Sequence, residues 1–213
     1  MRGDNIIWRD ADREQTIMNV GEISLKGTHN VENVLAGVCA GMLAGVDPAD
    51  IRRAVANFKA VEHRLEYVAT IRGVQYYNDS KATNVDATIK ALESFPGGIH
   101  LILGGKDKGS DYSALNSFLE KRVKWLYTIG AAAKKIESQV KGTQVVSSGT
   151  IDNAVRRASE SAVAGDIVLL APACASFDQF VSYEHRGRVF KDLVKQMEAR
   201  EAQPAGGRAG GKD

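Results

Sequence analysis

The chain has 213 residues, of which 44% are hydrophobic and 25% are charged, and its formal net charge is +2. This composition is typical of an ordinary globular protein and excludes a disordered chain. Because the net charge is close to zero, there is no bulk field to hold a polyanion, and nucleic acid is not an expected partner.

The first 60 residues predict two short strands followed by two helices. β-like pieces at 6–8 and 18–20 are too few to bury a sheet face, so residues 1–26 are expected to be the end of something larger. Apolar residues at helical spacing predict a helix over 31–43. A second helix, with Asp47 as N-cap and proline in its first turn, is predicted to run to about residue 58.

A β-hairpin is predicted next, and a domain boundary is expected near residue 60. The runs at 65–71 and 74–78 are rich in β-branched and aromatic residues and are joined at Arg72 and Gly73.

Beyond residue 84, strands and helices alternate. The expected strands lie at 99–103, 125–129, 144–146 and 167–170, and the expected helices at 85–92, 112–121, 131–140, 151–164 and 189–199. This alternation predicts an α/β fold with a mostly parallel sheet and helices on both faces. Residues 201–213 lack periodicity and are expected to form a disordered tail.

A polar loop at 78–84, N-D-S-K-A-T-N, follows the second strand of the hairpin. It lies at the carboxyl end of a strand, which is where α/β proteins bind ligands. The simpler interpretation is a turn in which Thr83 or Asn84 caps the next helix.

The loop at 104–111, G-G-K-D-K-G-S-D, offers Lys106 and Lys108 as point charges for a carboxylate or phosphate. It lacks the G-x-x-x-x-G-K-[ST] spacing of a phosphate loop, which occurs nowhere in the chain. The alternative is a solvated turn in which Asp111 caps a helix.

Arg64 is a candidate clamp for a phosphate or carboxylate, although the sequence alone favours a surface ion pair with Glu66 or Asp79. The four histidines lack metal-ligand spacing, so no protein-only zinc site is expected. Cys174 is interpreted as a small buried residue rather than a nucleophile.

Cys39 and Cys174 have no C-x-x-C spacing, which argues against a disulfide scaffold. No segment approaches the roughly 18 apolar residues of a membrane span, and the first residues lead into no long apolar run. The expectation is a cytoplasmic protein with reduced thiols and no membrane partner.

Five ordered motifs resemble the Mur ligases, and in particular the members that add D-glutamate. The motifs are L-K-G-T-H-N at 25–30, E-H-R-L-E at 62–66, N-D-S-K-A-T-N at 78–84, L-G-G-K-D-K-G at 103–109 and P-A-C-A-S-F-D at 172–178. The resemblance extends from about residue 18 to residue 198.

The resemblance implies that this chain is the C-terminal part of a three-domain ligase. Residues 1–60 would be a remnant of the central ATPase domain, and residues 61–200 the Rossmann-like C-terminal domain that binds the amino acid. The phosphate loop would lie in a part of the ligase that precedes this chain, and the fragment alone is expected to be inactive.

The resemblance also implies roles for individual residues. Asn30 and Asn33 would contact the adenine end of ATP, and Arg64 and Asp79 its phosphates and ribose. The following residues would bind the carboxylates of D-glutamate: Lys81, Thr83, Lys108, Ser176 and Tyr183. Arg64, Asp79 and Lys81 are the candidate catalytic residues, and most Mg²⁺ ligands would lie in the central domain, so none is assigned here.

The implied reaction is ATP-driven amide formation between UDP-N-acetylmuramoyl-L-alanine and D-glutamate through an acyl phosphate, in peptidoglycan precursor synthesis. A full-length member of this kind is expected to be a monomer. Two alternatives stay open: a stand-alone, non-catalytic domain that binds a nucleotide or acidic metabolite, and a ligase similar to folylpolyglutamate synthase.

Overall fold

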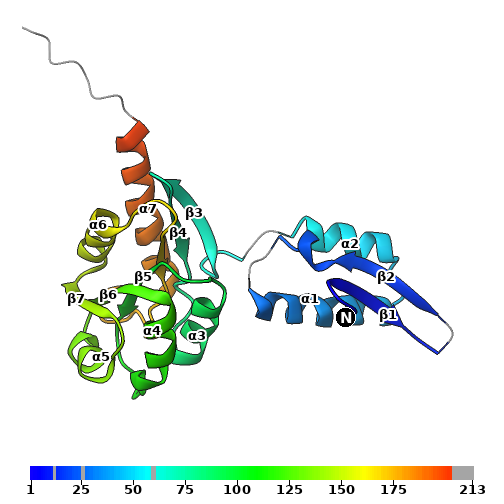
Figure 1. Ribbon diagram of the computed structural model, residues 1–213, viewed down its shortest axis with the longest axis horizontal. Helices are drawn as coiled ribbons and strands as arrows, with labels where there is room; N and C mark the ends of the chain where they lie inside the picture. The colour runs from blue at the N-terminus through cyan, green and yellow to red at the C-terminus, as the bar shows by residue number, and fades with distance from the viewer. Residues whose placement is uncertain (12, 25–26, 59–60, 203–213) are drawn as a thin grey trace, which may run out of the picture. The chain divides into compact units, whose positions relative to one another are not determined.

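The computed structural model describes residues 1–11, 13–24, 27–58 and 61–202 (Figure 1). The chain divides into two compact units, each described here by itself. The first comprises Met1–Glu62 and Glu93–Phe95, and the second comprises His63–Leu92 and the chain from Pro96 onward. None of the described helices combines the length and the apolar character needed to cross a membrane.

The first unit contains a two-stranded antiparallel sheet and two helices. Strand β1 (Asn5–Arg9) pairs with β2 (Glu14–Asn19), which is longer than the predicted strand because it includes polar residues on its exposed face. A 3-10 turn η1 (Val20–Glu22) leads toward α1 (Thr28–Leu43). Helix α2 (Pro48–Ala56) is capped by the Asp47 side chain, as predicted.

A small apolar cluster holds this unit together. Its buried members come from both strands and both helices: Ile6, Ile17, Met18, Val38 and Ile51. Cys39, next to Val38 on α1, is exposed, because only one face of the helix packs on the sheet.

The second unit is built on a six-stranded sheet. Its strands are β3 (Glu66–Ile71), β4 (Val74–Asn78), β5 (Ile99–Gly104), β6 (Val123–Ile129), β7 (Gln144–Gly149) and β8 (Ile167–Leu170). The strand order is β3-β4-β8-β5-β6-β7, and only the β3–β4 pair is antiparallel. The predicted α/β fold with a mostly parallel sheet is therefore confirmed.

Helices cover both faces of this sheet. They are α3 (Val85–Glu93), α4 (Asn116–Arg122) after the 3-10 turn η2 (Tyr112–Leu115), α5 (Ala133–Gln139), α6 (Ile151–Ser161) and α7 (Tyr183–Ala202). Figure 1 shows α6 and α7 on one face and α3, α4 and α5 on the other. Right-handed crossovers place α6 opposite α3, α4 and α5, because the chain reverses its direction across the sheet only between β7 and β8. Helix α7 follows the last strand and packs beside α6.

The predicted hairpin is present, and its turn has the chemistry expected. Arg72 and Gly73 have φ values of 50° and 77°, so both lie in the left-handed region that a two-residue type I′ turn requires. The central strands are also apolar on both faces as predicted, since every residue of β5 and β8 is buried.

Several predicted helix boundaries are wrong. Helix α7 begins at Tyr183, six residues before the predicted start, because Ser182 caps it: the Ser182 hydroxyl accepts a hydrogen bond from the His185 N–H at 3.2 Å. The same helix continues to Ala202, so the expected tail does not start at residue 201, and 203–213 lie outside the described residues. Helix α5 is shorter than predicted, and η2 replaces the first turn predicted at residue 112.

A buried polar cluster lies at the amino ends of the parallel strands. His100 at the start of β5 is 1% exposed, and its Nε2 lies 3.3 Å from Asp166 Oδ2. The Lys124 ammonium donates to the other oxygen of Asp166 at 2.5 Å, and the Tyr127 hydroxyl lies 3.1 Å from His100 Nδ1. Because its members satisfy one another, this cluster is interpreted as structural.

We expect Phe190→Ala to lower the free energy of unfolding by about 3–4 kcal/mol, because Phe190 of α7 is fully buried in the main core and its removal leaves a cavity. Urea denaturation measures this change. Phe177→Ala is the matched control: Phe177 is 66% exposed, so the loss should stay below about 0.5 kcal/mol. Equal losses in the two variants would contradict the packing described.

Candidate functional site

Three loops that are distant in the sequence meet at the carboxyl edge of the second unit's sheet. They follow β4, β8 and β5, which are adjacent strands in that order. Backbone hydrogen bonds join them: the Gly104 N–H donates to the Pro172 carbonyl at 2.9 Å, and the Ala173 N–H to the Ala82 carbonyl at 2.9 Å. This edge is where a parallel sheet places ligands.

The loop after β4 is held from inside by Asn78. Its side-chain amide donates to Glu66 Oε2 at 3.0 Å and lies 2.9 Å from His63 Nδ1, while its carbonyl accepts from the Ser80 N–H at 3.1 Å. At the other end of the loop, Asn84 caps α3 by accepting from the Ala87 N–H at 2.8 Å. The capping alternative is therefore correct for Asn84, while Lys81 between these anchors stays exposed.

The guanidinium of Arg186 joins two of these loops. Arg186 is fully buried on α7 and donates to the Ser80 hydroxyl at 3.0 Å and the Ser80 carbonyl at 2.9 Å. It also donates to the Cys174 carbonyl at 3.1 Å. Burial lowers the pKa of Arg186 to about 10, so the side chain is still charged at neutral pH.

The backbone of the loop after β8 leaves no room for a side chain at position 105. A Cβ atom on Gly105 would overlap the Ala175 carbonyl oxygen and approach the Arg186 guanidinium. Gly105 also has φ 138°, which side-chain-bearing residues rarely adopt. The first turn of the loop after β5 is therefore fixed against the loop after β8.

Arg64 lies between two residues with left-handed backbone conformations, His63 (φ 65°) and Leu65 (φ 42°). Positive φ values are uncommon for residues with side chains. Hydrogen bonds to neighbouring residues hold the backbone of His63 and Leu65 in this conformation. The His63 carbonyl accepts from the Lys81 N–H at 3.1 Å, and the Leu65 N–H donates to Asp79 Oδ1 at 3.2 Å.

The alternative interpretation, a surface ion pair of Arg64 with Glu66 or Asp79, is not observed among the described residues. Glu66 bonds instead to the Lys191 ammonium at 2.9 Å, and Arg64 itself is exposed. Asp79 is 6% exposed, and burial raises its pKa to about 6 against the opposing effects of the Leu65 N–H and the Arg64 charge.

The loop after β5 is organised by Asp107. Its carboxylate accepts from the Tyr112 hydroxyl at 2.8 Å, the Ser110 N–H at 3.2 Å and the Lys135 ammonium at 2.8 Å. Lys108, next in the chain, is exposed. Asp111 caps η2 by accepting from the Ser113 N–H at 2.9 Å, so the capping alternative holds for Asp111 too.

The loop after β8 carries Ser176 and leads to Tyr183, the first residue of α7. Ser176 is 2% exposed, and Tyr183 is partly buried. The Lys81 ammonium lies 5.9 Å from the centroid of the Tyr183 ring, so these two candidates meet. Cys174 is buried as predicted, with its sulfur 2.9 Å from the Tyr112 hydroxyl.

Asn30 and Asn33 lie in the first unit, on α1. The Asn33 side-chain amide donates to the side-chain oxygen Oδ1 of Asn30 at 3.4 Å. Asn33 borders a hollow of about 280 Å³ between α1 and α2, whose other lining residues are mainly apolar: Ile23, Val34, Gly37, Ala54, Val55 and Phe58. Apolar walls with one amide on the rim suit a flat heteroaromatic ring. Residues 25–26 of the first motif lie outside the described residues.

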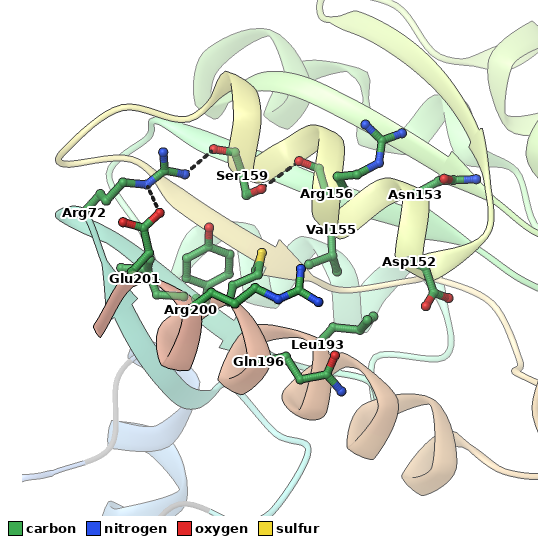
Figure 2. A pocket seen from close by; sticks show the side chains of 13 residues that line it. Arg72, Asp152, Asn153, Val155, Arg156, Ser159, Leu193, Gln196, Arg200 and Glu201 are labelled. Carbon is green, nitrogen blue, oxygen red and sulfur yellow. Dashed lines mark hydrogen bonds and ion pairs between the residues drawn. The ribbon is translucent and has the colours of Figure 1, made fainter. Parts of the chain in front are cut away.

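A second groove lies on the α6–α7 face of the sheet and contains none of the candidate residues (Figure 2). Figure 2 shows Arg200 lying along it, and an ion pair between Arg72 and Glu201 at 3.5 Å closes one end. Arg72 also donates to the Ser159 carbonyl. With positive and negative side chains mixed along its rim, this groove has no clear charge preference.

Sequence reasoning missed the residues that hold the loops: Asn78, Ser80, Asp107 and Arg186. Their partners lie as far as 109 positions away in the chain, as for the bond from the Asn78 amide to the Gly187 carbonyl, so no local pattern reveals them. Arg186 and Gly187 lie in the polar first turns of α7 yet are buried, so the hydrophobic pattern does not reveal them either. Among the described residues, no group of three or more His, Cys, Asp or Glu side chains is placed to hold a metal ion.

Residues 63–174 match the family model described as "Mur ligase, glutamate ligase domain". The chain belongs to the Mur ligase family. The match contains the loops after β4 and β5, and it begins at His63, the first residue of the second unit.

Two relatives of this Mur ligase chain are named UDP-N-acetylmuramoylalanine--D-glutamate ligase. The protein from Koribacter versatilis is 66% identical over 201 residues, which cover 94% of this chain and 44% of the relative. The protein from Acidobacterium capsulatum is 61% identical over 193 residues, which cover 89% of this chain and 42% of that relative. The chain thus spans less than half the length of these relatives.

Solved structures share the fold at low sequence identity. A pseudomurein peptide ligase type C from Methanothermus fervidus has a TM-score of 0.66 at 17% identity, covering 91% of this chain and 40% of that one. A bifunctional folylpolyglutamate synthase/dihydrofolate synthase from Yersinia pestis has a TM-score of 0.60 at 18% identity. The likeness covers 88% of this chain and 43% of that one. These likenesses show the fold and do not choose between ligases.

We expect Asp79→Asn to raise the free energy of unfolding by about 2 kcal/mol at pH 7.5, since the variant no longer buries a charge. The pKa of Asp79 in the folded chain is about 6, which is above its ordinary value. As the pH falls through 6, the folded chain therefore binds a proton at Asp79 before the unfolded chain does, and the buried charge is lost. The gain should therefore shrink strongly by pH 4.5. Urea denaturation of both chains at the two pH values measures it, and a gain independent of pH would contradict the raised pKa.

Proposed function

We propose that this chain provides the amino-acid site, and part of the nucleotide site, of a ligase that joins D-glutamate to UDP-N-acetylmuramoyl-L-alanine at the expense of ATP. The observation that carries the proposal is the 66% identity over 94% of the chain to a ligase of that name. It is supported by three polar loops gathered at one edge of the sheet, with exposed lysines on two of them.

The D-glutamate site is assigned to that edge. Lys81 and Lys108 neutralise the two carboxylates as point charges, and Thr83 and Ser176 supply hydroxyl groups. The Tyr183 ring, 5.9 Å from the Lys81 ammonium, restricts where that ammonium can lie. A dianionic amino acid needs this compensation, because it has to approach a polyphosphate of the same sign.

The nucleotide contacts are assigned to two groups of residues. Asn33, on the rim of the hollow between α1 and α2, and Asn30, which bonds to it, receive the adenine. Arg64 meets the phosphates and Asp79 the ribose. ATP supplies the activation of the carboxyl group, while the residues of this chain bind, orient and neutralise charge.

Mg²⁺ is not assigned to residues of this chain, because the resemblance places most of its ligands in the central domain. Arg64, Asp79 and Lys81 are the candidate catalytic residues. The Lys81 N–H and the Asp79 carboxylate bond to the backbone of His63 and Leu65, the two neighbours of Arg64, so the three residues lie on one connected stretch of structure.

We expect D-glutamate to bind the 213-residue chain with millimolar affinity, and L-glutamate more weakly. NMR titration should shift the amide signals of Lys81, Thr83 and Ser176. Lys81→Met should weaken binding about tenfold, and Lys141→Met, at an exposed lysine just after the C-terminal end of α5, should leave it unchanged. Equal response to both enantiomers, or no shifts at these residues, would count against the proposal.

The 213-residue chain by itself should show no ligase or ATPase turnover, since no G-x-x-x-x-G-K-[ST] sequence is present to hold the phosphates. Phosphate release is measured with ATP, Mg²⁺, D-glutamate and UDP-N-acetylmuramoyl-L-alanine. Release that depends on all four components would refute this expectation, and release without D-glutamate would favour a different nucleotide-hydrolysing activity.

A further inference from the structure

Asp107 is an unexpected neighbour for a lysine assigned to a carboxylate ligand. It precedes Lys108 in the loop after β5, and its contacts with the Tyr112 hydroxyl and the Ser110 N–H fix it in place. The Lys135 hydrogen bond, opposed by burial, holds its pKa at about 2, so the carboxylate is ionised at neutral pH. An ionised carboxylate here repels an anionic ligand and attracts Lys108.

Lys135 of α5 compensates this charge. Its ammonium lies 2.8 Å from Asp107 Oδ2 and 5.6 Å from the centroid of the Tyr112 ring. The two charged side chains are 36% and 28% exposed, so the pair is partly shielded from water and is stronger than a fully exposed one. Tyr112 extends the contact to the sulfur of Cys174, in the loop that carries Ser176.

We propose that Lys135 is a positioning residue for amino-acid binding: by neutralising Asp107, it leaves the Lys108 ammonium available for a carboxylate of the ligand. The inference rests on the proposed function, because it assumes that Lys108 binds the amino acid. Lys135 itself need not touch the ligand. Its effect is electrostatic and acts through Asp107.

A purely structural role for the same ion pair predicts different behaviour. If Lys135 only fastened the loop, any loss of the pair would weaken binding, and removing both charges would be no better than removing one. If Lys135 compensates a charge, removing Asp107's charge as well should restore binding. Asp107→Asn suits this comparison, because the amide oxygen still accepts from Tyr112 and Ser110.

The experiment titrates D-glutamate into four variants of the 213-residue chain and follows amide signals by NMR. Lys135→Met should weaken binding about fivefold, as expected for the loss of one partly exposed ion pair. Lys135→Met combined with Asp107→Asn should bind within about twofold of the unsubstituted chain. Lys135→Arg, which keeps the charge, should bind normally, and Lys134→Met, at the exposed neighbouring lysine, is the matched control.

The outcomes separate the inference from the proposed function. Failure of the unsubstituted chain to bind D-glutamate would overturn the proposed function, and the inference with it. Binding that Lys135→Met leaves unchanged, or a double variant at least as weak as Lys135→Met alone, would overturn the inference while the proposed function stood. Thermal unfolding of every variant checks that each one is folded.

Discussion

The site depends above all on one buried charge. Arg186 has no exposure to solvent, so its guanidinium needs protein acceptors, and it finds them in the loops after β4 and β8. These loops lie about 100 residues apart in the chain. A buried cation deprived of such carbonyl partners is strongly unfavourable, so the loops cannot separate without a large energetic cost. Arg186, which is itself fully buried, thus holds the loops that carry Lys81 and Ser176 in fixed positions relative to each other.

The strand order explains why the remaining loop joins them. Because β8 inserts between β4 and β5, the polar ends of three non-consecutive strands become neighbours. Asp107 then organises the third loop in the same way that Asn78 organises the first, with a side chain directed inward and an exposed lysine close by. The exposed Lys81 and Lys108 are therefore carried on backbone that is fixed by buried or partly buried side chains, which would reduce the ordering required if a ligand binds there.

Much of the fold was predictable from the sequence, because its patterns are local. The apolar runs of β5 and β8, the left-handed turn at Arg72 and Gly73, and the capping by Asp47 each depend on residues within a few positions. The early start of α7 was missed because its first turns are polar and its buried arginine looks like a surface residue in a periodicity analysis. The candidate lysines could be placed on strand-end loops, but the loop neighbours could not, since strand order is a non-local property.

The contrast between the two cysteines has a practical consequence. Cys39 is exposed on α1, whereas the sulfur of Cys174 is enclosed in the second unit beside the Tyr112 hydroxyl. Burial raises the pKa of the Cys174 thiol, which leaves it a poor nucleophile as well as an inaccessible one. A maleimide dye would therefore label the folded chain at a single natural position in the first unit. The chain carries its own attachment point for fluorescence or spin-label spectroscopy, without any engineered substitution.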